Sequence, residues 1–135
     1  MSARKLQERV MGMALMLNIK IWNRDFDLNV IYDCYAGEEI LDEQKAALNK
    51  FLSDNKMIDS SKADVEKYCL SQNKYEIGAD TIDNIFKYVM PEEIFVKRDG
   101  RVAILCKYKF DEEHGIAIVY KDNAIDDVGH QDIIL

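Results

Sequence analysis

Both histidines of this chain, together with a run of carboxylates, lie in its last twenty-six residues. The first group follows Phe110 and the second follows Gly129. Carboxylate and imidazole side chains are the groups that a divalent metal ion or a general acid–base pair requires. We therefore look for any chemistry of this chain at six candidates, which are Asp111, Glu112, Glu113, His114, His130 and Asp132.

These two groups flank a predicted β-hairpin. Alternating apolar residues predict one strand over Ile116–Tyr120 and a final strand that runs from Ile125 to Ile134. Between them, Asp122 and Asn123 favour a two-residue turn. Such a hairpin places both groups of candidates at the same end.

The register of this hairpin decides whether the histidines can act together. If Lys121 pairs with Ala124, His130 falls opposite Gly115, and the two histidines then point to opposite faces of the sheet. A bulge at a neighbouring glycine, or a slip that pairs Ile116 with His130, brings both histidines to one face. The sequence is compatible with both registers.

The spacing of the candidates favours a structural role over catalysis. Two histidines sixteen residues apart match no metal-binding motif such as H-E-x-x-H. In the structural interpretation the acidic run from Asp111 to Glu113 is a solvated turn, His114 tethers the start of the strand, and Asp132 closes the C-terminal turn. We therefore predict neither a bound metal ion nor another cofactor.

The length and charge of the chain limit the classes of protein to consider. A chain of 135 residues fits a single domain over residues 1–135, in which we expect residues 1–11 to be a flexible extension. The 18 basic and 25 acidic residues give a formal charge of −7, which repels nucleic acids and anionic membrane surfaces and favours a basic partner.

The three cysteines, Cys34, Cys69 and Cys106, are odd in number and show neither a C-x-x-C pair nor zinc-like spacing. We predict that they are small buried side chains in a reducing compartment. An apolar run long enough to cross a membrane is missing from the sequence. We therefore expect a cytoplasmic protein.

Upstream of the C-terminal hairpin, the periodicity predicts further strands and helices. Residues 15–21 and 26–32 alternate as an N-terminal hairpin. Helical spacing then predicts a helix from about Asp42 to Ser53, a second helix that begins at a capping box on Ser61, and a short third helix over Thr81–Lys87.

After Pro91 the pattern is again that of strands, at Ile94–Val96 and Val102–Tyr108, joined by a turn that contains Asp99-Gly100. The resulting fold class is α+β. We expect an antiparallel sheet made from the N-terminal hairpin and a C-terminal four-strand meander, with two to three helices packed on one face.

A group of basic residues and a group of aromatic residues could each mark a binding face or have a structural role. Five basic residues lie on one hairpin, and three aromatic residues crowd the first hairpin. We favour the ordinary interpretations, an edge strand protected by charge and core aromatics. The residues are Lys97, Arg98, Arg101, Lys107 and Lys109 for the basic group, and Trp22, Tyr32 and Tyr35 for the aromatic group.

Two motifs near the end of the chain carry a family resemblance. An aromatic residue followed by Asp-x-Glu-His-Gly spans Phe110 to Gly115, and Gly-x-Gln-Asp-Ile spans Gly129 to Ile133. With these motifs, residues 15–135 resemble an uncharacterised family of short bacterial proteins classed as a domain of unknown function. The resemblance implies a shared fold but no activity, and Phe110 stands where we expect tryptophan in that family.

We predict a non-enzymatic module that docks on another protein. Its most concrete form is an immunity or antitoxin-like protein that covers the sites of a basic toxin with carboxylates. The alternative is a metal-dependent hydrolase that uses Asp111, Glu113, His114, His130 and Asp132. A third interpretation is an accessory domain whose terminal motifs only lock the sheet.

Overall fold

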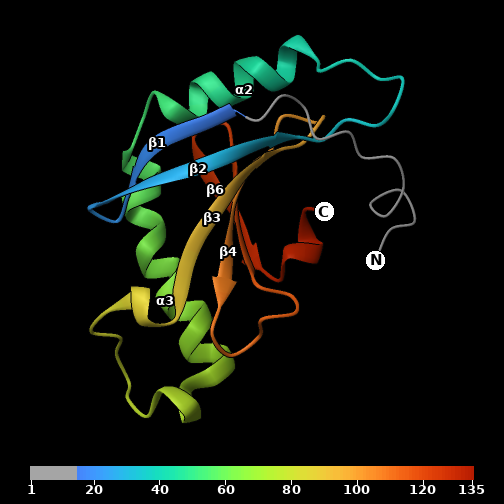
Figure 1. Cartoon of the computed structure of the whole chain (residues 1–135). Coiled ribbons are helices and arrows are strands. Elements are labelled where there is room, and N and C mark those ends of the chain that lie inside the picture. The colour runs from blue at the N-terminus through green and yellow to red at the C-terminus, as the bar shows by residue number, and fades with distance from the viewer. Residues whose placement is uncertain (1–14) are drawn as a thin grey trace.

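The computed structural model describes residues 15–135, and these form one six-stranded sheet with two α-helices (Figure 1). The predicted extension at residues 1–11 lies outside the described residues. The strands follow the order β1-β2-β3-β4-β5-β6 across the sheet. Their bounds are β1 Leu15–Ile21, β2 Arg24–Tyr32, β3 Val89–Val96, β4 Val102–Tyr108, β5 Ile116–Lys121 and β6 Ala124–Gly129.

The N-terminal hairpin confirms the predicted alternation. In β1 and β2 the buried residues recur at every second position and face the helices. The turn lies at Trp22 and Asn23, both with positive φ. The Trp22 indole N–H donates to the backbone oxygen of Ile58 and to Ser61 Oγ, so this turn is fixed to the helix behind it.

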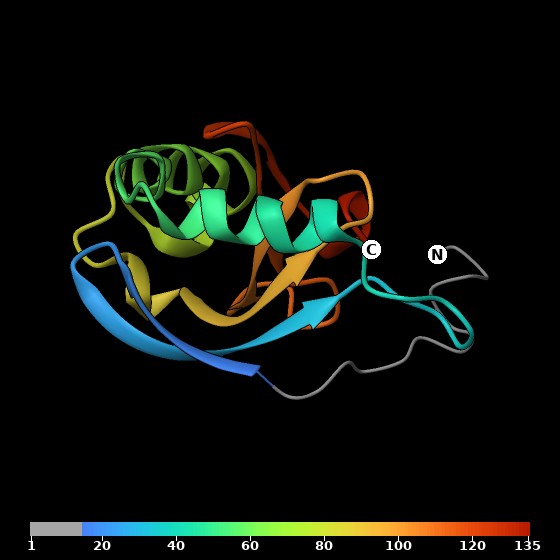
Figure 2. The same cartoon turned by 90° about the horizontal axis from the view of Figure 1, so that it is seen from above.

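The prediction of an antiparallel sheet is wrong at one seam, because β2 and β3 run parallel and the sheet is therefore mixed. Parallel neighbours need a crossover connection, and helices α2 (Asp42–Leu52) and α3 (Lys56–Ile77) provide it. Figure 2 shows both helices on one side of the sheet, as predicted. The buried Gln44 side chain donates to the backbone oxygens of Asp33 and Val96, and this ties α2 to the ends of both parallel strands.

The predicted first helix is confirmed as α2, whereas the start of the second helix and the extent of the third need correction. Helix α3 begins at Lys56, so Ser61 is an interior residue and not its N-cap. Ser61 is buried, and its Oγ accepts the hydroxyl of Tyr120 from β5. The predicted third helix reduces to a 3-10 turn, η1 (Ile85–Lys87), and the side chain of Asn84 caps it.

The predicted C-terminal meander is confirmed, since β3 to β6 pair antiparallel in sequence order. Strand β3 already begins at Val89, and its register shifts between Pro91 and Glu93. The final strand ends at Gly129, earlier than predicted. A 3-10 turn, η2 (Gln131–Ile133), follows it.

Each face of the sheet carries its own core. The larger core lies between the sheet and the helices. On the opposite face a smaller cluster, centred on Phe95, Leu105 and Val119, is closed by Ile134 from the chain end. The Lys97 ammonium donates to the backbone oxygen of Ile134 at 2.6 Å. The last residues of the chain are therefore part of the fold.

Candidate functional site

The β5–β6 hairpin brings the two histidines together. Its turn lies at Asp122 and Asn123, as predicted, and Lys121 pairs with Ala124. A register shift between Val119 and Tyr120 then moves all later pairs by one residue, so that Ala117 lies opposite Gly129. Beyond the shift the hairpin thus follows the register in which Ile116 faces His130. In this register the two histidines lie on the same face.

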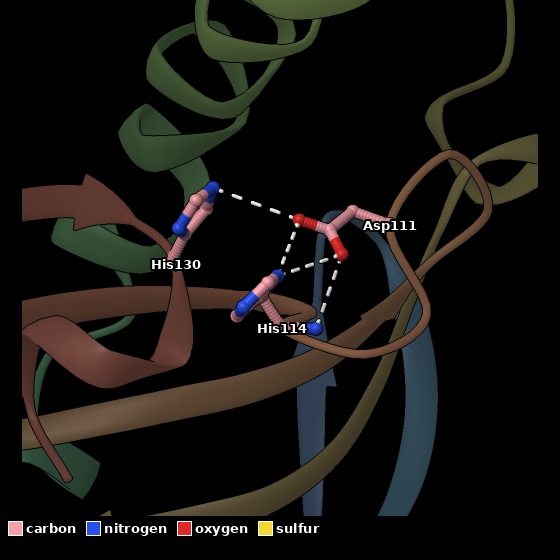
Figure 3. A group of neighbouring side chains, drawn as sticks. All are labelled: Asp111, His114 and His130. Carbon is pink, nitrogen blue, oxygen red and sulfur yellow. Dashed lines mark hydrogen bonds and ion pairs between the residues drawn. The ribbon is translucent and has the colours of Figure 1, made fainter. Parts of the chain in front are cut away.

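Asp111, His114 and His130 form a cluster at this corner (Figure 3). The two imidazole rings stack with their centroids 4.8 Å apart and an angle of 14° between them. The carboxylate of Asp111 lies 3.0 and 3.1 Å from Nδ1 of His114 and 3.6 Å from Nε2 of His130. Both histidines therefore turn a ring nitrogen toward one carboxylate.

Asp111 also fixes the turn that carries His114. Its carboxylate accepts the backbone N–H of His114 at 3.2 Å, and its backbone oxygen accepts that of Gly115 at 2.9 Å. The hydrogen bond to Asp111 raises the pKa of His114 above the ordinary histidine value, with help from the charges of Glu113 and Asp132. Partial burial opposes ionisation of Asp111, but the hydrogen bonds and charge of His114 outweigh it and lower the pKa of that carboxyl.

The predicted candidates divide into two sets. Asp111, His114 and His130 offer ligand atoms that all lie within 4.8 Å of one another. Glu113 and Asp132 are exposed and influence His114 through their charge. Glu112 is likewise exposed.

A shallow groove of about 440 Å³ opens beside His130, between the C-terminal half of α3 and the turn after β6. Tyr68 and Gln72 of α3 line it together with Gly129, Asp132 and Ile133. Tyr68 and Gln72 are four residues apart, a spacing that predicts a shared helix face but not that this face borders the C-terminal corner.

The two terminal motifs interlock. Gly115 has a φ of +57°, and a Cβ atom placed there would lie 2.5 Å from both the backbone oxygen of Cys106 and Nε2 of Gln131. The Gln131 amide donates to that same oxygen of Cys106, and the Gln131 backbone N–H donates to the backbone oxygen of His114. Only glycine fits this crossing of the two segments.

The cysteines are buried and free of disulfides, as predicted. Burial raises the pKa of the Cys69 thiol to about 11, and it also raises that of Cys106. Buried thiols of this kind are poor nucleophiles. The cysteines therefore add nothing to the chemistry of the corner.

The aromatic group and the basic group found in the sequence both make contacts within the fold. Trp22 is buried, while Tyr32 and Tyr35 are half-buried. The basic residues lie on β3, β4 and the residues next to them rather than on an edge strand, so the edge-protection interpretation is wrong. They have internal partners in the contacts Lys97–Ile134, Arg98–Glu38, Arg101–Asp99, Lys107–Glu92 and Lys109–Tyr88.

Negative charge concentrates in the C-terminal segment that carries the cluster. Residues 110–135 contain seven acidic side chains and one lysine, a net −6 of the −7 on the whole chain. Strand β6 lies at one edge of the described sheet. Six exposed carboxylates lie on β6 or at the connections beside it, and we call them the acidic edge: Glu112, Glu113, Asp122, Asp126, Asp127 and Asp132.

The architecture defines an α+β protein with a mixed six-stranded sheet, two helices on one face and a polar corner at the chain end. The chain belongs to the family described as a domain of unknown function (DUF6985), whose model matches residues 6–135. The comparisons with curated proteins and with solved structures gave no match. Within residues 15–135, none of the helices combines the length and apolar character that a membrane span requires.

Proposed function

We propose that this domain is a non-enzymatic binding module whose acidic edge docks on a basic protein. The observation that supports this proposal most strongly is the distribution of charge. Residues 1–109 contain 18 acidic and 17 basic residues, whereas residues 110–135 contain seven and one. A near-neutral body whose C-terminal hairpin is strongly negative orients a basic partner toward that hairpin during encounter.

The place of the charge in the fold supports the same proposal. Asp126 and Asp127 are exposed on β6, which is an edge strand of the described sheet. Hollows lie at both ends of this strand, one beside His130 and the other beside Asp122. An elongated surface with carboxylates between two hollows can accept basic side chains from a partner without rearrangement of the sheet. An immunity or antitoxin-like role, in which the partner is a basic toxin, is the specific form of this proposal.

Affinity capture with matched charge variants tests the proposal. Three immobilised baits are compared in extracts of the source cells: the wild-type chain, Asp126→Lys/Asp127→Lys on β6, and Asp25→Lys/Asp27→Lys on β2. The two variants carry the same charge change, on strands that lie far apart in the sheet order. We expect a basic protein that the wild type and the β2 variant retain and the β6 variant loses.

Two outcomes would refute the proposal. One is recovery of abundant chaperones alone on all three baits. The other is a partner that the β6 variant retains as well as the wild type does, in which case the carboxylates of β6 only protect an edge strand from pairing with other chains.

A further inference from the structure

We infer that Asp111, His114 and His130 form a binding site for a divalent first-row transition metal ion, with Zn²⁺ as the reference case. This inference concerns the metal ion alone and does not depend on the docking surface proposed above. It departs from the prediction that the sequence supports, because the two histidines match no metal-binding motif. The fold supplies the proximity that the spacing along the chain does not.

The three donor atoms are close to a coordination geometry. The Asp111 carboxylate lies 3.0 Å from His114 Nδ1 and 3.6 Å from His130 Nε2. Metal–ligand bonds of about 2.0–2.1 Å place neighbouring ligand atoms of a tetrahedral Zn²⁺ site roughly 3.3 Å apart. All the ligand atoms lie within 4.8 Å of one another, and because the two rings stack at 14°, at least one imidazole must turn for both rings to bind one ion.

The backbone beneath the site is fixed, whereas the side chains remain adjustable. The backbone N–H of Gln131, next to His130, donates to the backbone oxygen of His114 at 3.0 Å. This hydrogen bond holds the two histidine-bearing segments together. The imidazoles themselves are 39% and 49% exposed for His114 and His130, so each ring can turn to meet an ion.

The donor set determines which ion binds. Two imidazoles and one carboxylate suit Zn²⁺, Cu²⁺, Ni²⁺ and Co²⁺, whereas Mg²⁺ and Ca²⁺ prefer oxygen ligands alone. The neighbouring carboxylates of Glu113 and Asp132 attract cations of either kind and therefore add affinity but not selectivity. Three protein ligands leave at least one coordination position open. The groove lined by Tyr68, Gln72 and Asp132 adjoins His130, and both histidines are partly exposed, so water or an incoming ligand can reach the ion.

The composition of the chain makes the site simple to test. The chain has two histidines, and both are in this site. Its three cysteines are buried and cannot compete for the ion in the folded protein. Imidazole coordination by a tag-free sample therefore reports on this cluster.

The experiment is a calorimetric titration of the tag-free full chain, freed of metal with a chelator, with Zn²⁺, Ni²⁺ and Mg²⁺ in turn. We expect one Zn²⁺ or Ni²⁺ per chain and no measurable Mg²⁺ binding. Loss of an outer partner of a metal ligand typically weakens metal binding by about 10–100-fold, so loss of a ligand in His130→Ala or Asp111→Asn should weaken it at least about tenfold. The matched controls Glu112→Gln and Glu113→Gln should stay within about twofold of the wild type.

A spectroscopic readout separates coordination from general charge attraction. Cu²⁺ bound to the wild type should show electron paramagnetic resonance couplings to two imidazole nitrogens, and to one in His130→Ala. His130 is exposed, and circular dichroism checks that this variant folds. Equal Zn²⁺ affinity of the wild type and His130→Ala, or the absence of nitrogen coupling, would overturn the inference. Both results would leave the capture experiment unaffected.

Discussion

At the scale of single residues, the corner depends on Gly115. Its backbone adopts a positive φ, and two polar groups from different segments approach the position where a Cβ would stand. The Asp-x-Glu-His-Gly motif therefore has a structural explanation in this chain. Asp111 fixes the turn, and Gly115 permits the crossing with Gln131.

Gly115→Ala should be strongly destabilising. Left-handed backbone costs a residue with a Cβ about 1–2 kcal/mol, and the clash with Cys106 and Gln131 adds to this, so we expect a loss of roughly 2–4 kcal/mol in the free energy of unfolding. Gly78→Ala is the matched control, because Gly78 has a φ of +74° but nothing within 4 Å of the added atom. Denaturant titration measures both. Equal losses would show that the crossing tolerates a side chain.

At the scale of elements, the chain end acts as a cover for the second core. Ile134 is fully buried against Phe95, Leu105 and Val119 on the face of the sheet opposite the helices. Its backbone oxygen accepts a hydrogen bond from Lys97. The residues after His130 therefore position the corner and also close a hydrophobic layer.

Ile134→Ala should lower stability by about 2–4 kcal/mol, the usual range for loss of a large buried aliphatic side chain. Leu135→Ala serves as its neighbour control, since Leu135 is only partly buried, and it should cost clearly less. Thermal and denaturant unfolding of both variants check this expectation. A loss below about 1 kcal/mol for Ile134→Ala would mean that the chain end is not an integral cover.

The parallel seam between β2 and β3 depends on one buried amide. Gln44→Leu removes the hydrogen bonds to the backbone oxygens of Asp33 and Val96 and to the backbone N–H of Leu41. The Val96 oxygen still accepts the backbone N–H of Asp33, but the Asp33 oxygen and the Leu41 N–H lose the Gln44 amide. Buried polar groups left without partners cost about 1–3 kcal/mol each, so we expect a total loss of roughly 2–4 kcal/mol. Lys45→Leu, at the exposed neighbouring position, should change stability by less than about 0.5 kcal/mol. Similar unfolding midpoints for the two variants would contradict this role of Gln44.

The sequence predicted the elements whose signals are local. Alternation identified both hairpins, and helical spacing with Asp42 and Glu43 at the start identified α2. The capping pattern at Ser61 was misleading, because a Ser-x-x-Asp spacing also occurs inside a helix. Here Ser61 is used for buried contacts with Trp22 and Tyr120.

Features that depend on distant pairing were not predictable in the same way. The parallel seam arises because the helices carry the chain across the sheet between β2 and β3, and each strand alone looks the same in either direction. The register that unites the histidines depends on a shift between Val119 and Tyr120, far from both rings. The sequence therefore identified the six candidate residues but could not decide which of them meet.

At the scale of the whole molecule, the C-terminal segment carries almost all the net charge, as the composition of residues 110–135 shows. This asymmetry makes association with a basic partner sensitive to salt. The association rate constant, measured by stopped flow with the captured partner, should fall at least about tenfold between low and high ionic strength. The Asp126→Lys/Asp127→Lys variant should associate slowly at all salt concentrations. An association rate constant that does not change with salt would exclude electrostatic steering by the acidic edge.

The most direct test of docking through the acidic edge is to locate the bound partner on the surface of this domain. Hydrogen exchange of the chain, alone and in complex with the captured partner, reports which backbone amides the partner protects. Docking through the acidic edge predicts new protection along β6 and over residues 110–116, with little change in β1 and β2. Protection confined to β1, β2 or α2, with β6 exchanging as in the free chain, would contradict docking through the acidic edge.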